Sequence, residues 1–149
     1  MSVDDKVNPS LEDLLAGFDL EVSVGIHEDD GGKAHGEDGL TTADVGSFHE
    51  FGLGVPQRSF LRGYFDEHQA EIDEASDAAV ERILGGADPR QQAGRVGLLM
   101  ESGIKERMLA RIPPPLAPST RKRRGESAVP LVDTSQLIGA VRSKVTVRQ

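Results

Sequence analysis

Apolar and polar residues alternate along the segment from residue 19 to residue 27. The apolar positions are Leu20, Val22, Val24 and Ile26, and charged or small residues stand between them. A period of two is typical of a β-strand that buries one face. A similar pattern through VRSKVTVR, at residues 141–148, predicts a second strand near the end of the chain.

Two long segments between these strands repeat their apolar residues every three or four positions, which predicts two amphipathic helices. The first helix is expected over residues 59–84, because a pair of glycines follows it. The second is expected to begin with Asp88 as its N-cap and Pro89 as its first residue, and to end at the prolines of residues 113–115. Its apolar stripe is Val96, Met100, Ile104, Met108 and Ile112.

Shorter helices are expected elsewhere. One is predicted over residues 10–17, and a second follows Thr41 or Thr42, either of which can cap it. A third precedes the last strand, with Asp133 or Thr134 as its cap. Its inward-facing residues are expected to be Leu137, Ile138 and Val141.

This order of elements predicts an α+β fold, in which a small, mostly antiparallel sheet packs against the two long amphipathic helices. We expect a single domain over residues 1–149, because the length matches one ordinary domain with a core of its own. Residues 1–8 are expected to be disordered. Residues 28–39 are expected to form a long flexible acidic loop, because they hold five acidic residues, several glycines and no large apolar side chain.

Charge is divided unevenly along the chain, whose net charge is −8. Residues 1–90 hold 21 acidic and 6 basic residues, whereas residues 91–149 hold 4 acidic and 11 basic residues. The overall acidity argues against general binding to a phosphate backbone. The division has two interpretations: acidic and basic parts of neighbouring subunits meet head to tail, or both parts are solvated surfaces.

Several classes of protein are excluded or disfavoured by composition. The chain has no Cys, which excludes disulfides, thiolate metal sites and Cys nucleophiles. It has no Trp and one Tyr, which disfavours stacking on nucleic-acid bases. No apolar run is long enough to span a membrane, and the polar N-terminus does not resemble a signal peptide, so no membrane partner is expected.

Two alternative functions rest on particular residues. His27 and His35, with the acidic residues of the loop, could hold a metal in a small acidic metal-dependent hydrolase. The cluster RKRR at residues 121–124 could contact phosphates in a small nucleic-acid-binding module. His49 and Glu50 begin an HExxH pattern, but residue 53 is Leu, so the pattern fails. Because no nucleophile elbow or phosphate loop is present either, we expect no catalytic residues, no cofactor and no metal.

Three segments occur in a characteristic order. They are FHEFGLGVPQRSFLRGYFDE at residues 48–67, PLAPSTRKRR at residues 115–124 and PLVDTSQLIGAVRSKV at residues 130–145. Together they resemble the neck and tail-completion proteins of tailed bacteriophages, also called the virion morphogenesis family. The resemblance covers residues 19–147 and departs from the family pattern at Ser59 and Ser135, where the family often has Pro and Gly.

The resemblance implies a structural virion protein and no enzyme. It implies a homo-oligomeric ring, with six copies as the first expectation, at the head–tail junction, where the ring contacts adjacent neck and tail proteins. DNA would pass through the channel without sequence-specific binding. The location would be the virion, with assembly in the host cytoplasm.

The residues that carry the resemblance are expected to have structural or interface roles. Gly52 and Gly54 would allow a sharp turn, Arg58 would fork onto a carboxylate or onto helix-end carbonyls, and Phe60 would anchor the long helix. Leu131 would staple the terminal helix. The full set is Glu50, Phe51, Gly52, Pro56, Arg58, Phe60, Leu116, Thr120, Arg121, Lys122, Arg123, Arg124, Leu131, Asp133, Thr134 and Leu137.

Overall fold

Two antiparallel strands and six helices make up the described part of the chain, which is residues 19–131 and 135–148 of the computed structural model. The predicted α+β fold is confirmed. In chain order the elements are β1 (Leu20–Ile26), α2 (Glu28–Gly31), α3 (Thr42–Phe51), α4 (Leu61–Leu84), α5 (Pro89–Leu109), α6 (Pro118–Arg124), α7 (Gln136–Ala140) and β2 (Val141–Val147).

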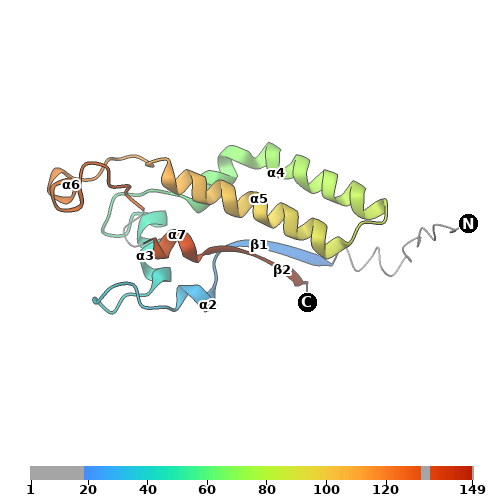
Figure 1. The fold of residues 1–149 in the computed structure, drawn as a ribbon, viewed down its shortest axis with the longest axis horizontal. Helices are drawn as coiled ribbons and strands as arrows, with labels where there is room; N and C mark the ends of the chain where they lie inside the picture. The colour runs from blue at the N-terminus through green and yellow to red at the C-terminus, as the bar shows by residue number, and fades with distance from the viewer. Residues whose placement is uncertain (1–18, 132–134, 149) are drawn as a thin grey trace, which may run out of the picture.

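The sheet joins the two ends of the described chain. Both strands are predicted by their alternating patterns, and β1 pairs with β2 from Leu20 opposite Val147 to Ile26 opposite Val141. Their apolar side chains share one face, which α5 covers, and α4 packs mainly on the other side of α5 (Figure 1). The order of layers is therefore sheet, α5, α4, with α5 as the central element.

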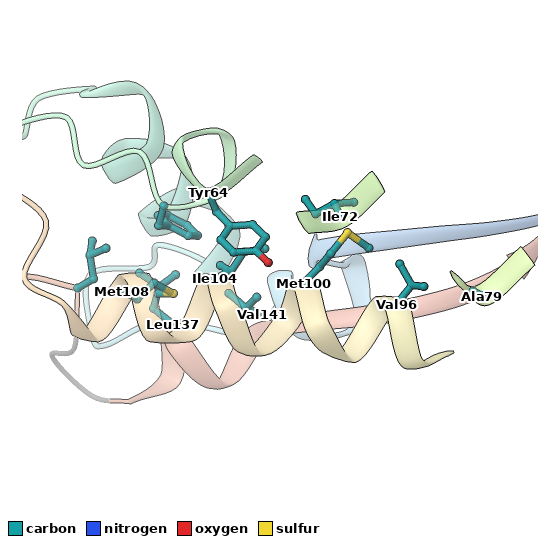
Figure 2. Close-up of a cluster of buried hydrophobic side chains, with 11 residues drawn as sticks. Tyr64, Ile72, Ala79, Val96, Met100, Ile104, Met108, Leu137 and Val141 are labelled. Carbon is teal, nitrogen blue, oxygen red and sulfur yellow. The ribbon is translucent and has the colours of Figure 1, made fainter. Parts of the chain in front are cut away.

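The core follows the apolar stripe of α5. Val96, Met100, Ile104 and Met108 are all buried, as the i+4 spacing predicts. Figure 2 shows side chains of α4, α7 and β2 converging on this stripe. The fifth stripe position, Ile112, lies beyond the helix, because α5 ends at Leu109, ahead of the proline run.

Two glycines of α5 allow the layers to approach closely. A Cβ atom on Gly97 would lie 3.0 Å from Cβ of Ser143, so this glycine sets the distance between α5 and β2. A Cβ atom on Gly103 would lie 2.3 Å from Cε2 of Tyr64, which is 2% exposed. Gly103 thus provides the space that the Tyr64 ring occupies between α4 and α5.

Helix α4 bends near its start. The backbone of His68 leaves helical geometry, with φ of −119° and ψ of 18°. Its Nδ1 atom lies 3.0 Å from the carbonyl oxygen of Tyr64, and the two rings stack with centroids 4.5 Å apart. His68 is half-buried at this bend.

Local signals at the helix ends are mostly confirmed. Thr41 forms a capping box with Asp44 at the start of α3. Asp88 accepts a hydrogen bond from the Gln91 N–H at the start of α5, as expected. The N-cap of α7 is Ser135, and it makes no side-chain cap, whereas Asp133 or Thr134 was expected to cap this helix.

The prediction of a loop throughout residues 28–39 is wrong for residues 28–31, which form α2. The buried Gly31 packs against Ala43 and Ile26, and it has no side chain to prevent this approach. Acidic residues in the first turn of α2 also favour a helix at this point.

Some expectations concern residues outside the described ranges. These are the disorder of residues 1–8, the helix at residues 10–17, and the side chains of Asp133 and Thr134. Within residues 19–131 and 135–148, no helix combines the length and apolar character needed to cross a bilayer.

The two glycines Gly103 and Gly94 give a matched test of the close contact between α4 and α5. Gly103→Ala should lower the free energy of unfolding by about 1–3 kcal/mol, because the new methyl group collides with the buried Tyr64 ring. Gly94→Ala, on the same helix, meets no atom within 4 Å and should raise it by up to about 1 kcal/mol. Urea denaturation measures both, and equal effects of the two substitutions would show that the packing is not as described.

Candidate functional site

The three segments that carry the resemblance meet at one end of the molecule. Helices α3, α6 and α7 all lie at this end (Figure 1). Residues of these three helices line a cleft of about 560 Å³. Residues from each segment line it, including Pro56, Leu116 and Leu137. The structure thus brings together positions that are more than 80 residues apart in the sequence, and this end of the molecule is the candidate functional site.

Glu50 joins α3 to the start of α4. Its carboxylate is 94% buried and accepts hydrogen bonds from the N–H groups of Phe60 and Leu61, both at 2.9 Å, and of Arg62, at 3.0 Å. It also accepts one from the Ser59 hydroxyl at 2.7 Å. A carboxylate at this position satisfies backbone donors that a helix start leaves unpaired, and it interacts favourably with the helix dipole.

Ser59 completes this arrangement. Its hydroxyl oxygen accepts a hydrogen bond from the Gly63 N–H at 3.0 Å, so the donors of the first turn of α4 are satisfied by two side chains. The first residue of α4, Leu61, follows Phe60, whose ring is fully buried in the core. Phe60 thus places the start of α4 against the core.

The turn between α3 and α4 has the glycine geometry that the sequence predicts. Gly52 has φ of 73° and Gly54 has φ of 74°, both in the left-handed region. After the turn, the Arg58 N–H donates to the His49 carbonyl oxygen at 2.7 Å, which closes the loop back onto α3. Two other residues of the segment, Phe51 and Pro56, are exposed, and Pro56 also lines the cleft.

Arg58 connects this turn to the chain that follows α5. Its Nε and Nη2 atoms both donate to the carbonyl oxygen of Pro114, at 3.1 and 2.7 Å. The predicted fork is thus onto a carbonyl, although that carbonyl belongs to the proline turn and not to the helix end. Arg58 is only 3% exposed, and burial lowers the pKa of its guanidinium.

The basic cluster on α6 is divided between solvent and the cleft. Lys122 and Arg123 are exposed, whereas Arg124 and Thr120 line the cleft. Arg121 lies 3.8 Å from Glu126, and the side chains of this pair are 42% and 85% exposed, so it contributes little to stability. Four consecutive basic residues therefore do not form one continuous basic surface.

The third segment supplies buried residues. Leu131 is 2% exposed and Leu137 is 4% exposed, and both belong to the core and to the wall of the cleft. Asp133 and Thr134 lie outside the described residues.

Acidic residues of α2 form ion pairs with β2 of the same chain. Lys144 lies 2.6 Å from Asp29, and Arg142 lies 4.0 Å from Asp30, which also pairs with Lys33 at 2.5 Å. The hydrogen bond from Lys144 lowers the pKa of Asp29, and the one from Lys33 lowers the pKa of Asp30. Part of the charge complementarity between the two halves of the chain is therefore satisfied within one subunit.

The histidines do not gather around a metal. His27 lies 3.1 Å through Nε2 from the Arg142 carbonyl oxygen at the sheet, while His35 faces the cleft. Across residues 19–131 and 135–148, no three His, Asp or Glu side chains are placed to hold an ion together. His49 also faces the cleft, and Glu50, next to it, is fully used in capping α4.

The polar groups that face the cleft are mainly basic. Burial, with the charges of Arg58 and Arg124 and the nearby His35, lowers the pKa of His49. Asp38 is the acidic residue among the lining residues. No local sequence pattern marks His35 and His49 as cleft residues, because only the fold brings them into the cleft that Arg58 also lines.

Compared with known proteins, the chain gives no significant match to any family model, curated protein or solved structure.

Glu50→Gln tests the role of this carboxylate in capping α4. An amide NH₂ would replace one oxygen and face backbone N–H donors, so the free energy of unfolding should fall by about 2–3 kcal/mol. Glu74→Gln, at an exposed position on α4, is the control and should change stability by less than about 0.5 kcal/mol. Chemical denaturation measures both, and equal stability of Glu50→Gln and the wild type would contradict the capping role.

Proposed function

We propose that this chain is a structural virion protein that forms a ring at the head–tail junction of a tailed bacteriophage. In this role it joins head to tail around the DNA channel, as the sequence resemblance implies. The proposal concerns the assembly of identical subunits and their contacts with adjacent neck and tail proteins.

The observation that carries the proposal is the use of the resemblance residues in building one end of the subunit. Glu50 caps α4, Arg58 ties the turn to Pro114, and Phe60 fills the core. These contacts hold helices and turns in place, and each involves backbone groups or apolar packing. Such roles fit a protein whose function is to present a defined shape to its neighbours.

The small sheet offers a means of assembly. Ser143 N–H donates to the Glu101 carboxylate at 2.8 Å and so points away from β1. In an antiparallel ladder, its partner Val24 then also directs its N–H and C=O away from β2. Among the described residues no third strand pairs with this edge of β1. An extended segment of a neighbouring copy could add to it by main-chain hydrogen bonds.

Exposed apolar residues add a second means of assembly. Phe51 is 61% exposed and Leu53 is 55% exposed, and both lie at the turn that begins the resemblance. Large apolar side chains that lie close together at the surface are typical of interaction sites. A ring of identical subunits would bury this turn against the next copy.

Ring formation is tested on the full chain by native mass spectrometry and negative-stain electron microscopy. We expect closed rings of about six copies, because identical head-to-tail contacts close into a ring when the rotation permits. Phe51→Ser should shift the population toward monomer. Leu84→Ser, which removes an equally exposed leucine at the far end of α4, should leave the rings intact.

Two results would contradict the proposal. Hydrolysis of phosphate esters by a monomeric chain, dependent on added divalent metal and on His27 and His35, would favour a hydrolase. Binding of duplex DNA by a monomer, lost when Lys122 and Arg123 are changed to Ala, would favour a nucleic-acid-binding module.

A further inference from the structure

The cleft described above combines apolar walls with a buried cation. Most of its lining residues are apolar, and they include Val45, Val55 and Leu131. Its volume of about 560 Å³ lies in the usual range for sites that bind small molecules or peptide side chains. The cleft is therefore large enough for a ligand and selective for one with apolar surface.

Arg58 has no counter-charge among the residues that the structure describes. The two described hydrogen bonds of its guanidinium go to a neutral acceptor, the Pro114 carbonyl oxygen. No carboxylate among residues 19–131 and 135–148 lies within 4.0 Å of its guanidinium. A buried charge is costly without an ionic partner, and in proteins such charges are usually paired.

Two histidines beside Arg58 have unused hydrogen-bonding atoms. The Nδ1 atoms of His35 and His49 are buried, and neither bonds to any residue that the structure describes. Both rings face the cleft, as does Arg124. Guanidinium groups and protonated imidazoles form strong, charge-assisted hydrogen bonds with carboxylates.

We propose that this cleft binds a carboxylate group carried on an apolar stem, with Arg58, His49 and His35 around the carboxylate. The apolar walls distinguish this ligand from inorganic phosphate, whose strongly hydrated oxygens would face hydrocarbon. Such a carboxylate is available from the end or an acidic side chain of a peptide, and also from a free aliphatic acid. The site does not depend on the proposed ring, because every group in it belongs to one subunit.

The test is a titration of the full chain followed by NMR of the four histidine rings, assigned by single His→Gln variants. Hexanoate should shift the His35 and His49 resonances saturably. Hexanol has the same stem without the charge and should not shift them. His27 and His68 lie away from the cleft lining and serve as internal controls.

A second pair of probes distinguishes the two sources of the carboxylate. N-acetyl-leucine carries the terminal carboxylate of a peptide, and N-acetyl-leucinamide lacks it. Tighter binding of N-acetyl-leucine than of hexanoate assigns the site to a peptide, and the reverse order assigns it to a free aliphatic acid. Equal shifts with the charged and uncharged members of each pair, no saturable shift, or stronger binding of inorganic phosphate would overturn the proposal.

Binding should also take up a proton at His49. Its pKa is lowered in the free subunit, so the ring is neutral at pH 7.5, and a bound carboxylate would raise the pKa. Among the described residues, the other charged or titratable groups that line the cleft are Arg58, Arg124, His35 and Asp38. Affinity for hexanoate should therefore rise roughly fivefold between pH 7.5 and pH 5.5. His49→Gln should reduce this dependence, and His68→Gln should retain it.

Because the Arg58 guanidinium also bonds to the Pro114 carbonyl oxygen, substitution of Arg58 risks unfolding the subunit. A different variant therefore tests the site by placing a carboxylate in the cleft. Thr120→Glu places a carboxylate on the cleft side of α6, whereas Ser119→Glu places one on the exposed side. Both lie in the first turn of α6, where a negative charge interacts equally with the helix. Thr120→Glu should melt about 3 °C higher than Ser119→Glu and lose hexanoate binding. Equal melting with unchanged binding in both variants would contradict the site.

Discussion

The position of the whole candidate site depends on one carboxylate. Glu50 lies in the last turn of α3 and accepts hydrogen bonds from three backbone N–H groups at the start of α4, so it fixes these two helices relative to each other. The group is buried, and removing its charge would leave several donors without an acceptor in a place that water does not reach. A helix start within a core needs such a partner, and here a neighbouring helix provides it.

The contact between α3 and the start of α4 also determines where the chain after α5 lies. Arg58 lies at the end of the turn that follows Glu50. Its guanidinium donates to the Pro114 carbonyl oxygen and so positions the connection that leads to α6. The cleft lies between these segments, where apolar residues around the turn face the proline run. Architecture and candidate binding site are therefore built from the same residues. This explains why substitution of Arg58 would affect both.

The sequence predicted the elements whose formation depends on local patterns. Periodicity located both strands and both long helices, and the stripe from Val96 to Met108 is buried as expected. Contacts between distant elements could not be predicted in this way. Glu50 reads as an ordinary polar helix residue, and nothing in its local sequence shows that its partner is the start of the next helix. Likewise, Gly97 and Gly103 allow close packing only because Ser143 and Tyr64 lie opposite them.

The cleft shows the same limit. His35 and His49 stand in segments that suggested a metal loop or a failed protease motif, and only the fold places both beside Arg58. Local order in the acidic loop was also missed, because α2 depends on packing of Gly31 against Ala43. Short-range patterns thus predict secondary structure, whereas buried polar groups acquire their roles from tertiary contacts.

Amide hydrogen exchange at the start of α4 tests the role of Glu50 most directly. If the Glu50 carboxylate holds α3 and α4 together in the native state, the amides of Phe60, Leu61 and Arg62 will exchange only through global unfolding. They will then exchange as slowly as the amide of the buried Ile104. If these three amides exchange at the fast rate of a frayed helix end while Ile104 remains protected, the proposed role of Glu50 is contradicted.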